Sequence, residues 1–212
     1  MISIKEPGKP AQKAAADVKF AKVVISVNAL VPLAFLLYDG SQGRLGANPI
    51  EFFLRATGVL TLIFLMITLA VTPARRILGR NDLIKYRRML GLYAFFYACL
   101  HLVTYSIFDK SLDIPAIVAD VVQRPFIAVG MAAFLMLVPL AVTSTNGWVK
   151  RLGGKNWSKL HKLSYLIAVL GVIHFWMIVK SDLFYPVFFG LVLTALLGWR
   201  IWKWIASQKA RV

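Results

Sequence analysis

Residues 88–108 read RMLGLYAFFYACLHLVTYSIF, a predominantly apolar run whose only charged residue is Arg88 at its start. As a helix rising about 1.5 Å per residue, this run is long enough to cross a hydrocarbon core about 30 Å thick. Comparable apolar runs lie at 20–38, 52–72, 125–143, 160–179 and 183–204. Since alternating β-barrel patterning is absent, the sequence predicts an all-α integral membrane protein, a six-helix bundle.

The composition supports this class of protein. Hydrophobic residues make up 59% of the 212 residues and charged residues only 16%, against about 25% in typical soluble domains, so a soluble globule is excluded.

We expect an N-terminal arm at 1–19, one transmembrane domain at 20–206 and a tail at 207–212. The run at 20–38 has no convincing cleavage site after it and is interpreted as a span rather than a signal peptide. The single cysteine, Cys99, excludes an intrachain disulfide.

The net charge of +16 is distributed unevenly along the chain. Twenty of the 25 Lys and Arg lie in or beside the N-terminal arm, the 73–87 and 144–159 loops and the C-terminal tail. The positive-inside rule therefore predicts that these segments, both termini included, face the cytoplasm. The charge is a topology signal, and we predict no nucleic-acid partner.

Two of the three histidines occur at matching depths. His101 lies 13 residues beyond Arg88, where the third span enters the membrane, and His174 lies 13 residues beyond His161, where the fifth span enters. Both are about 20 Å deep, an arrangement required of the two axial ligands of one haem iron. Zinc is less consistent, because no Cys or carboxylate lies at that depth. The neighbouring small residues either make room for a porphyrin or allow close helix packing; they are Gly91, Ala94, Ala98, Ala168 and Gly171.

No second histidine lies at the depth of His161. On a straight helix His161 points about 140° away from His174, so the two cannot share one porphyrin face, and no fourth histidine exists to complete an inner bis-histidine haem. We predict that His161 ligates a second, inner haem from one side, or contacts a flavin or quinone, while Arg87 or Arg88 neutralises a propionate or phosphate. The alternative is an interfacial histidine that is hydrogen-bonded to lipid headgroups or to Trp157.

Two stretches resemble signatures of a known family. RRMLGLYAFFYACLHLVTYSIFD at 87–109 and WSKLHKLSYLIAVLGVIHF at 157–175 resemble the third and fifth spans of the MsrQ family, formerly YedZ, whose length and six-span plan match nearly the whole chain. The resemblance implies a ferric reductase-like transmembrane domain that binds haem b in the bacterial inner membrane. It also implies a cytoplasmic-side donor, either a flavin reductase with FMN or the quinone pool. The partner it implies is MsrP, a periplasmic molybdopterin enzyme that reduces methionine sulfoxide in oxidised envelope proteins.

Three classes of function compete. The leading hypothesis is a transmembrane electron-transfer subunit that feeds an external reductase and does not reduce methionine sulfoxide alone. A self-contained ferric or NADPH oxidase-like enzyme would need a flavin and nicotinamide domain, yet about eight residues follow the last predicted span, and the chain has no G-x-G-x-x-G fingerprint or P-loop. The third class is a non-redox transporter or assembly factor whose histidines carry protons or form structural hydrogen bonds.

Overall fold

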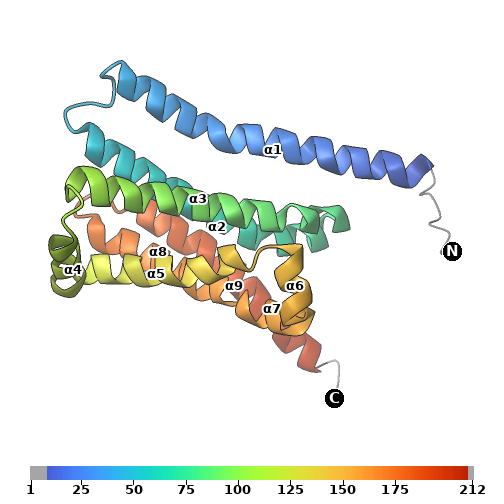
Figure 1. Cartoon of the computed structure of the whole chain (residues 1–212). Coiled ribbons are helices and arrows are strands. Elements are labelled where there is room, and N and C mark those ends of the chain that lie inside the picture. The colour runs from blue at the N-terminus through green and yellow to red at the C-terminus, as the bar shows by residue number, and fades with distance from the viewer. Residues whose placement is uncertain (1–8, 210–212) are drawn as a thin grey trace. The chain divides into compact units, whose positions relative to one another are not determined.

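The computed structural model describes residues 9–209, in which the regular structure is entirely helical (Figure 1). The chain divides into two compact units, residues 1–49 and 50–212. The first unit contains α1 (Lys9–Ser41), a helix that is continuous through Pro32. Since α1 begins at Lys9, residues 9–19 of the predicted arm extend the helix. Residues 1–8 of that arm and 210–212 of the predicted tail lie outside the described residues.

The second unit contains the remaining elements of the chain. They are α2 (Pro49–Ile77), the 3₁₀ turn η1 (Asn81–Lys85), α3 (Arg87–Thr104), the π-helical turn η2 (Tyr105–Asp109), α4 (Ile114–Gln123), α5 (Pro125–Val142), α6 (Asn146–Leu152), α7 (Gly154–Leu160), α8 (Leu163–Ile178) and α9 (Phe184–Lys209).

Six segments of the described chain are helical, long and apolar enough to cross a membrane. They are Ala16–Ser41, Pro49–Ile77, Arg87–Asp109, Pro125–Val142, Gly154–Ile178 and Phe184–Lys209. Each overlaps one of the six predicted runs, so the predicted all-α, six-span class is confirmed. The boundaries differ by up to six residues, because most of the helices continue past the apolar runs into their polar flanks.

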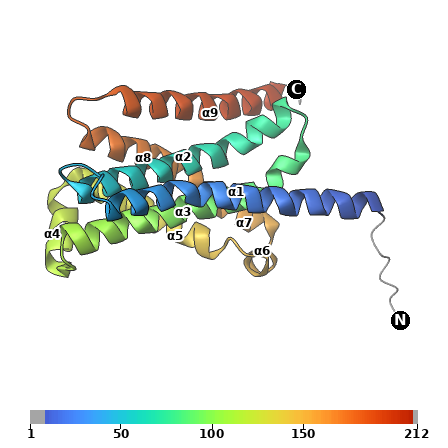
Figure 2. The same ribbon diagram turned by 90° about the horizontal axis from the view of Figure 1, so that it is seen from above.

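Within the second unit, α5 packs along α8, and α9 lies on the other side of α8 and α2 (Figure 2). The buried core joins three helices through Leu62, Met66 and Leu69 of α2, Ala168 of α8, and Phe189 and Leu193 of α9. Because lipid tails are as apolar as these side chains, close packing rather than exclusion of water holds such helices together.

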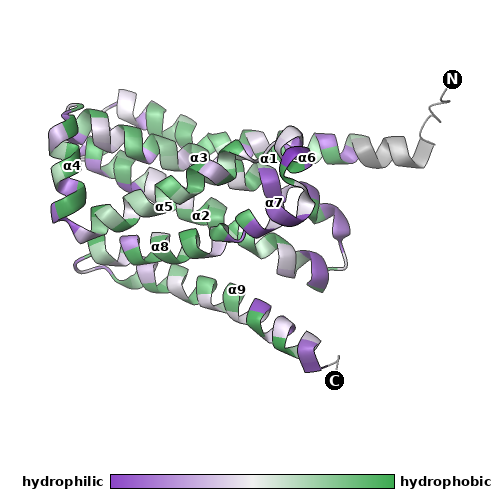
Figure 3. Cartoon of the chain, turned by 60° about the horizontal axis from the view of Figure 1, so that its bottom comes forward, coloured by the Kyte–Doolittle hydropathy of each residue, from purple (hydrophilic) through white to green (hydrophobic). Residues whose placement is uncertain are grey.

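The two ends of the second unit differ in polarity. At one end the connection from α3 to α5 contains α4, and at the other the connection from α5 to α8 contains α6 and α7 (Figure 1). We call these the α4 end and the α6–α7 end. Hydrophilic residues gather on α6 and α7, whereas the long helices between the ends are mainly hydrophobic (Figure 3).

One arginine connects three helices near the α6–α7 end. Pro73 of α2 has no N–H, so the carbonyl of Leu69, four residues earlier, lacks its normal helical partner. Arg200 of α9 donates from Nη2 to this oxygen, and its guanidinium lies 5.1 Å from the ring centroid of Tyr165 in α8. A side chain from one helix thus satisfies a carbonyl that a proline has freed in another, as apolar surroundings require.

We therefore expect Arg200→Leu to lower the free energy of unfolding by about 1–3 kcal/mol, because the Leu69 oxygen loses its donor. In a Pro73→Ala background the cost should be clearly smaller, because an alanine at position 73 returns an N–H to that oxygen. Unfolding of all four proteins in mixed micelles, compared as a double-mutant cycle, measures the difference. An equal cost of Arg200→Leu in both backgrounds would contradict this explanation.

Candidate functional site

His101 and His174 face one cavity. The cavity has a volume of about 340 Å³ and is lined by residues of α2, α3, α5 and α8, both histidines among them. The two imidazole centroids lie 6.2 Å apart, and the ring planes are nearly perpendicular, at 88°. The structure therefore brings together the two residues that the sequence placed at matching depths.

Each of these two rings is oriented by a backbone carbonyl of a neighbouring helix. Nδ1 of His101 lies 2.9 Å from the oxygen of Leu54 in α2, and Nδ1 of His174 lies 2.6 Å from the oxygen of Phe126 in α5. A carbonyl oxygen only accepts hydrogen bonds, so in this geometry Nδ1 carries the proton in both rings. The lone pair is then on Nε2, the state in which a histidine ligates a metal while its other nitrogen donates to an outer partner.

Two glycines allow these hydrogen bonds to form. Gly58 and Gly130 follow Leu54 and Phe126 by four residues, which is one helical turn. A Cβ added at Gly130 would lie 2.7 Å from Cε1 and 2.8 Å from Nδ1 of His174, and one at Gly58 would lie 3.1 Å from Nδ1 of His101. Any larger residue at position 130 would displace the ring, so the missing Cβ is what lets His174 reach the backbone of α5.

Gly58 and Gly130 are not among the site residues predicted from the sequence. The only available signal was an isolated glycine within an apolar span, which has many structural explanations. Of the small residues that were singled out from the sequence, Ala98 and Gly171 line the cavity. The alternative of close packing holds for the other three: Ala94 and Ala168 are fully buried outside the cavity lining, and a Cβ at Gly91 would make ordinary contact with Thr68.

The donor set fits a metal held in a macrocycle. Within the described residues, no group of three or more His, Cys, Asp or Glu is placed to hold a bare metal ion. Two imidazoles that share one metal, with bonds of about 2 Å to each nitrogen, have centroids about 6 Å apart, which agrees with the observed 6.2 Å. Two axial nitrogens and an apolar cavity therefore suit haem, whose porphyrin supplies the other four ligands.

A buried carboxylate organises the α4 end of the site. Asp120 of α4 accepts a hydrogen bond from the Tyr105 hydroxyl at 2.9 Å and lies 2.6 Å from Nζ of Lys110 and 3.5 Å from Nε of Arg124. The hydrogen bond from Lys110, with that from Tyr105, holds the pKa of Asp120 below its usual value, so this carboxylate is ionised at neutral pH. The network connects the π-helical turn, α4 and the start of α5. Its α5 side is Arg124, two residues before Phe126, whose carbonyl orients His174.

His161 lies apart from the other two histidines. Neither His161 nor Arg87 nor Arg88 lines the cavity of His101 and His174. The helix breaks at His161, which ends α7 before α8 begins at Leu163. The straight helix assumed in the sequence analysis is therefore absent, although the separation of His161 from His174 remains.

The neighbours of His161 are a threonine and a tryptophan. Its ring stacks on Trp157 with centroids 3.9 Å apart, and its Nε2 lies 3.1 Å from Oγ1 of Thr143. The Thr143 hydroxyl donates to the Pro139 oxygen at 2.6 Å, so its single proton is used and Nε2 of His161 is the donor between them. This tautomer leaves Nδ1 as the unprotonated nitrogen.

The predicted arginines also lie at the α6–α7 end. Arg87 and Arg88 begin α3, and Nη1 of Arg88 donates to Oδ1 of Asn146, the first residue of α6, at 2.6 Å. Trp157 donates from Nε1 to the Thr143 oxygen at 2.8 Å, so its contact with His161 is ring stacking rather than the hydrogen bond that the alternative interpretation of His161 expected.

Comparison with known proteins gives one consistent result. The family described as "Ferric reductase like transmembrane component" matches residues 55–172, from α2 to α8. A protein of Herminiimonas arsenicoxydans is 52% identical over 191 residues, which cover 89% of this chain and 88% of that protein. Proteins of Ralstonia nicotianae and Xanthomonas euvesicatoria are 46% and 44% identical, with 89% and 93% of this chain and 88% and 93% of theirs covered.

All three relatives carry the name "Protein-methionine-sulfoxide reductase heme-binding subunit MsrQ". The identities are high over nearly the full length of both partners in each comparison, and the matched family model spans more than half of the chain. The chain therefore belongs to the MsrQ family, within the ferric reductase-like transmembrane group.

Proposed function

We propose that this chain is the haem-binding membrane subunit of a protein-methionine-sulfoxide reductase system and that it carries electrons across the bacterial inner membrane. The observation that carries the proposal is the pair formed by His101 and His174, two imidazoles 6.2 Å apart across one cavity. The names of the relatives support both the cofactor and the system. When bound, haem b supplies an iron that accepts and releases one electron at a time.

The residues of this chain hold and insulate that group. His101 and His174 present Nε2 to the cavity, because the carbonyls of Leu54 and Phe126 fix the opposite nitrogens. Leu65 and Leu137 are buried residues of the lining away from the α4 end. Such an apolar wall excludes water and lowers the local dielectric, one of the means by which a protein sets a reduction potential.

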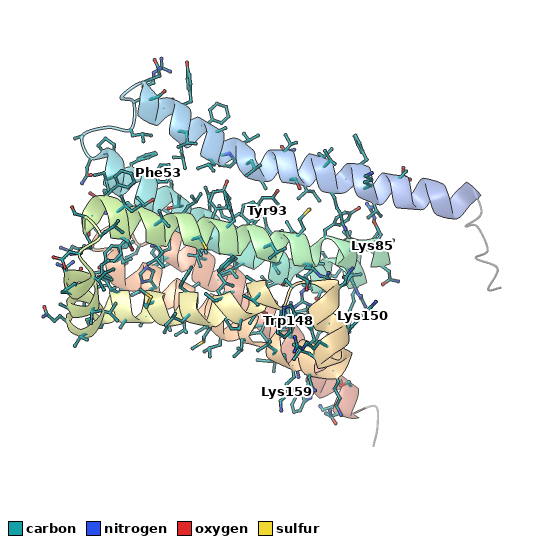
Figure 4. The ribbon with its side chains drawn as sticks, in the orientation of Figure 1. Phe53, Lys85, Tyr93, Trp148, Lys150 and Lys159 are labelled. Atoms are coloured by element: carbon teal, nitrogen blue, oxygen red, sulfur yellow. The ribbon has the colours of Figure 1, made fainter. Side chains whose placement is uncertain are left out.

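The distribution of charge supports an orientation of the chain in the membrane. Lys85, Lys150 and Lys159 are three of the basic residues at the α6–α7 end (Figure 4), and 20 of the 25 Lys and Arg belong to the segments predicted to be cytoplasmic. The positive-inside rule supports a cytoplasmic α6–α7 end, cytoplasmic termini and a periplasmic α4 end. Electrons then enter at the α6–α7 end and leave at the α4 end for a periplasmic molybdopterin reductase of the MsrP type, which holds the site of sulfoxide reduction.

The entry point that we propose is the region of His161, Arg87 and Arg88. Two guanidinium groups at the same end of the bundle as an imidazole suit a flavin phosphate or the propionate of an inner haem, and a quinone is the third candidate. The donor is accordingly a flavin reductase with FMN or the quinone pool. The hydrogen bond with Thr143 uses Nε2 of His161, and the stacking on Trp157 uses neither ring nitrogen. These contacts therefore leave Nδ1 for a cofactor.

We expect His101→Ala and His174→Ala each to remove the low-spin haem spectrum and to abolish electron delivery to the periplasmic partner, because either change removes one axial ligand. Absorbance spectra of the purified proteins, expressed with ample haem, give the first measurement, and reduction of methionine sulfoxide with the partner gives the second. Unchanged spectra and full transfer in both variants would contradict the ligand pair. A wild-type protein without Soret absorbance would favour the non-redox alternative.

Gly130→Ala tests the close approach of α5 to His174. We expect the added methyl to cost about 1–3 kcal/mol, which corresponds to roughly 5- to 150-fold weaker haem binding, with part of the haem converted to high spin. Gly198→Ala in α9 is the matched control, because a Cβ there meets nothing within 4 Å. Equal haem affinity in the two variants would show that the ring of His174 does not depend on the glycine.

His161→Ala separates the entry site from the haem ligands. We expect slower reduction of the protein from the cytoplasmic side, while the low-spin spectrum stays nearly intact because His161 is outside the cavity. Stopped-flow reduction with flavin reductase and FMN, and separately with a quinol, measures the rate. Loss of the low-spin signal, or wild-type rates with both donors, would refute this division of roles.

A further inference from the structure

The haem cavity is polar at one end only. Charged side chains in its lining are confined to the α4 end, where they come from the start of α2, the end of the third span and the start of α5: Glu51, Arg55, Asp109 and Arg124. The remainder is mostly apolar and includes Leu65, Leu137 and Ile167. A ligand with one acidic edge and an apolar body is therefore accommodated in only one orientation.

The two arginines are positioned by the same turns that hold the histidines. Arg55 directly follows Leu54, whose carbonyl accepts from His101. Arg124 lies two residues before Phe126, whose carbonyl accepts from His174. Both arginines line the cavity, and each belongs to a turn whose carbonyl holds one of the two imidazoles. This placement gives one cation for each side of the histidine pair.

Neither arginine is held strongly by its present ion-pair partner. Arg55 pairs with Glu51 one turn earlier, and both side chains are about half exposed or more, at 63% and 49%. Arg124 lies 3.5 Å from an Asp120 oxygen, whereas Lys110 is at 2.6 Å and Tyr105 already donates to the same carboxylate. An exposed ion pair such as that of Arg55 and Glu51 contributes only about 0–1 kcal/mol. Asp120 is buried, but it keeps Lys110 and Tyr105 as partners when Arg124 moves away, so a new carboxylate can replace either partner at small cost.

We propose that Arg55 and Arg124 bind the two propionate carboxylates of the haem and so fix the porphyrin with its acidic edge at the α4 end. The inference rests on the proposed function, since it requires haem between His101 and His174. A guanidinium matches a carboxylate with two parallel hydrogen bonds. The opposite orientation would bury two carboxylates among leucine and isoleucine side chains without partners, which is strongly unfavourable.

The test measures haem release from the full-length protein in nanodiscs, with an excess of a soluble haem-scavenging apoprotein. We expect Arg55→Gln and Arg124→Gln each to release haem about tenfold faster than wild type, and the double variant faster still. Arg124→Lys should restore part of the retention because it keeps the charge. Lys180→Gln is the control, since Lys180 is exposed near the same end and does not line the cavity.

Reconstitution with haem dimethyl ester identifies the propionates as the groups bound. With this ester, wild type and both arginine variants should release the ligand at equal rates, because the carboxylates are blocked. Release from the arginine variants no faster than from Lys180→Gln, or an equally large effect of the arginines with the ester, would overturn the inference. The proposed function would survive either result, because it fails only if wild type binds no haem or if His101→Ala and His174→Ala retain the low-spin spectrum.

Discussion

The site depends on hydrogen bonds between two imidazoles and the backbones of neighbouring helices. His174 reaches the carbonyl of Phe126 only because Gly130, one turn later, has no Cβ, and Gly58 makes room in the same way for the contact of His101 with the carbonyl of Leu54. The same arrangement occurs twice, once between α3 and α2 and once between α8 and α5. It sets the separation of two helix pairs, the tautomer of both rings and the width of the cavity between them.

An apolar environment explains why hydrogen bonds between a side chain and a backbone carbonyl restrict the packing of these helices so strongly. A polar group buried in a membrane protein must find its partner within the protein, since neither lipid nor water supplies one there. Arg200 follows this rule when it donates to the Leu69 carbonyl that Pro73 leaves free. Each of these contacts pairs a side chain of one helix with a carbonyl of another, and this restricts how the helices can pack more than apolar surface does.

The sequence was sufficient to predict the six spans and the pairing of His101 with His174, because span length and residue depth depend on helix rise and bilayer thickness alone. Gly58 and Gly130 could not be identified, since their role depends on which helix packs against which. The contact of Arg200 with Leu69 joins residues 131 positions apart, so no local pattern indicates it. The break at His161 was missed because the span was treated as one straight helix from its apolar content.

The contrast between the two ends bears on how each would recognise its partner. At the α4 end, Asp120 lies among Tyr105, Lys110 and Arg124, and Arg55 pairs with Glu51, so opposite charges largely offset one another. At the α6–α7 end the basic residues are in large excess, and Arg88 contacts Asn146 of α6 there. A positive field attracts anionic donors and lipid headgroups and weakens as salt is added. A donor that docks at the α6–α7 end, as proposed, would therefore be attracted by charge, whereas a partner at the α4 end would be selected by shape and local hydrogen bonds.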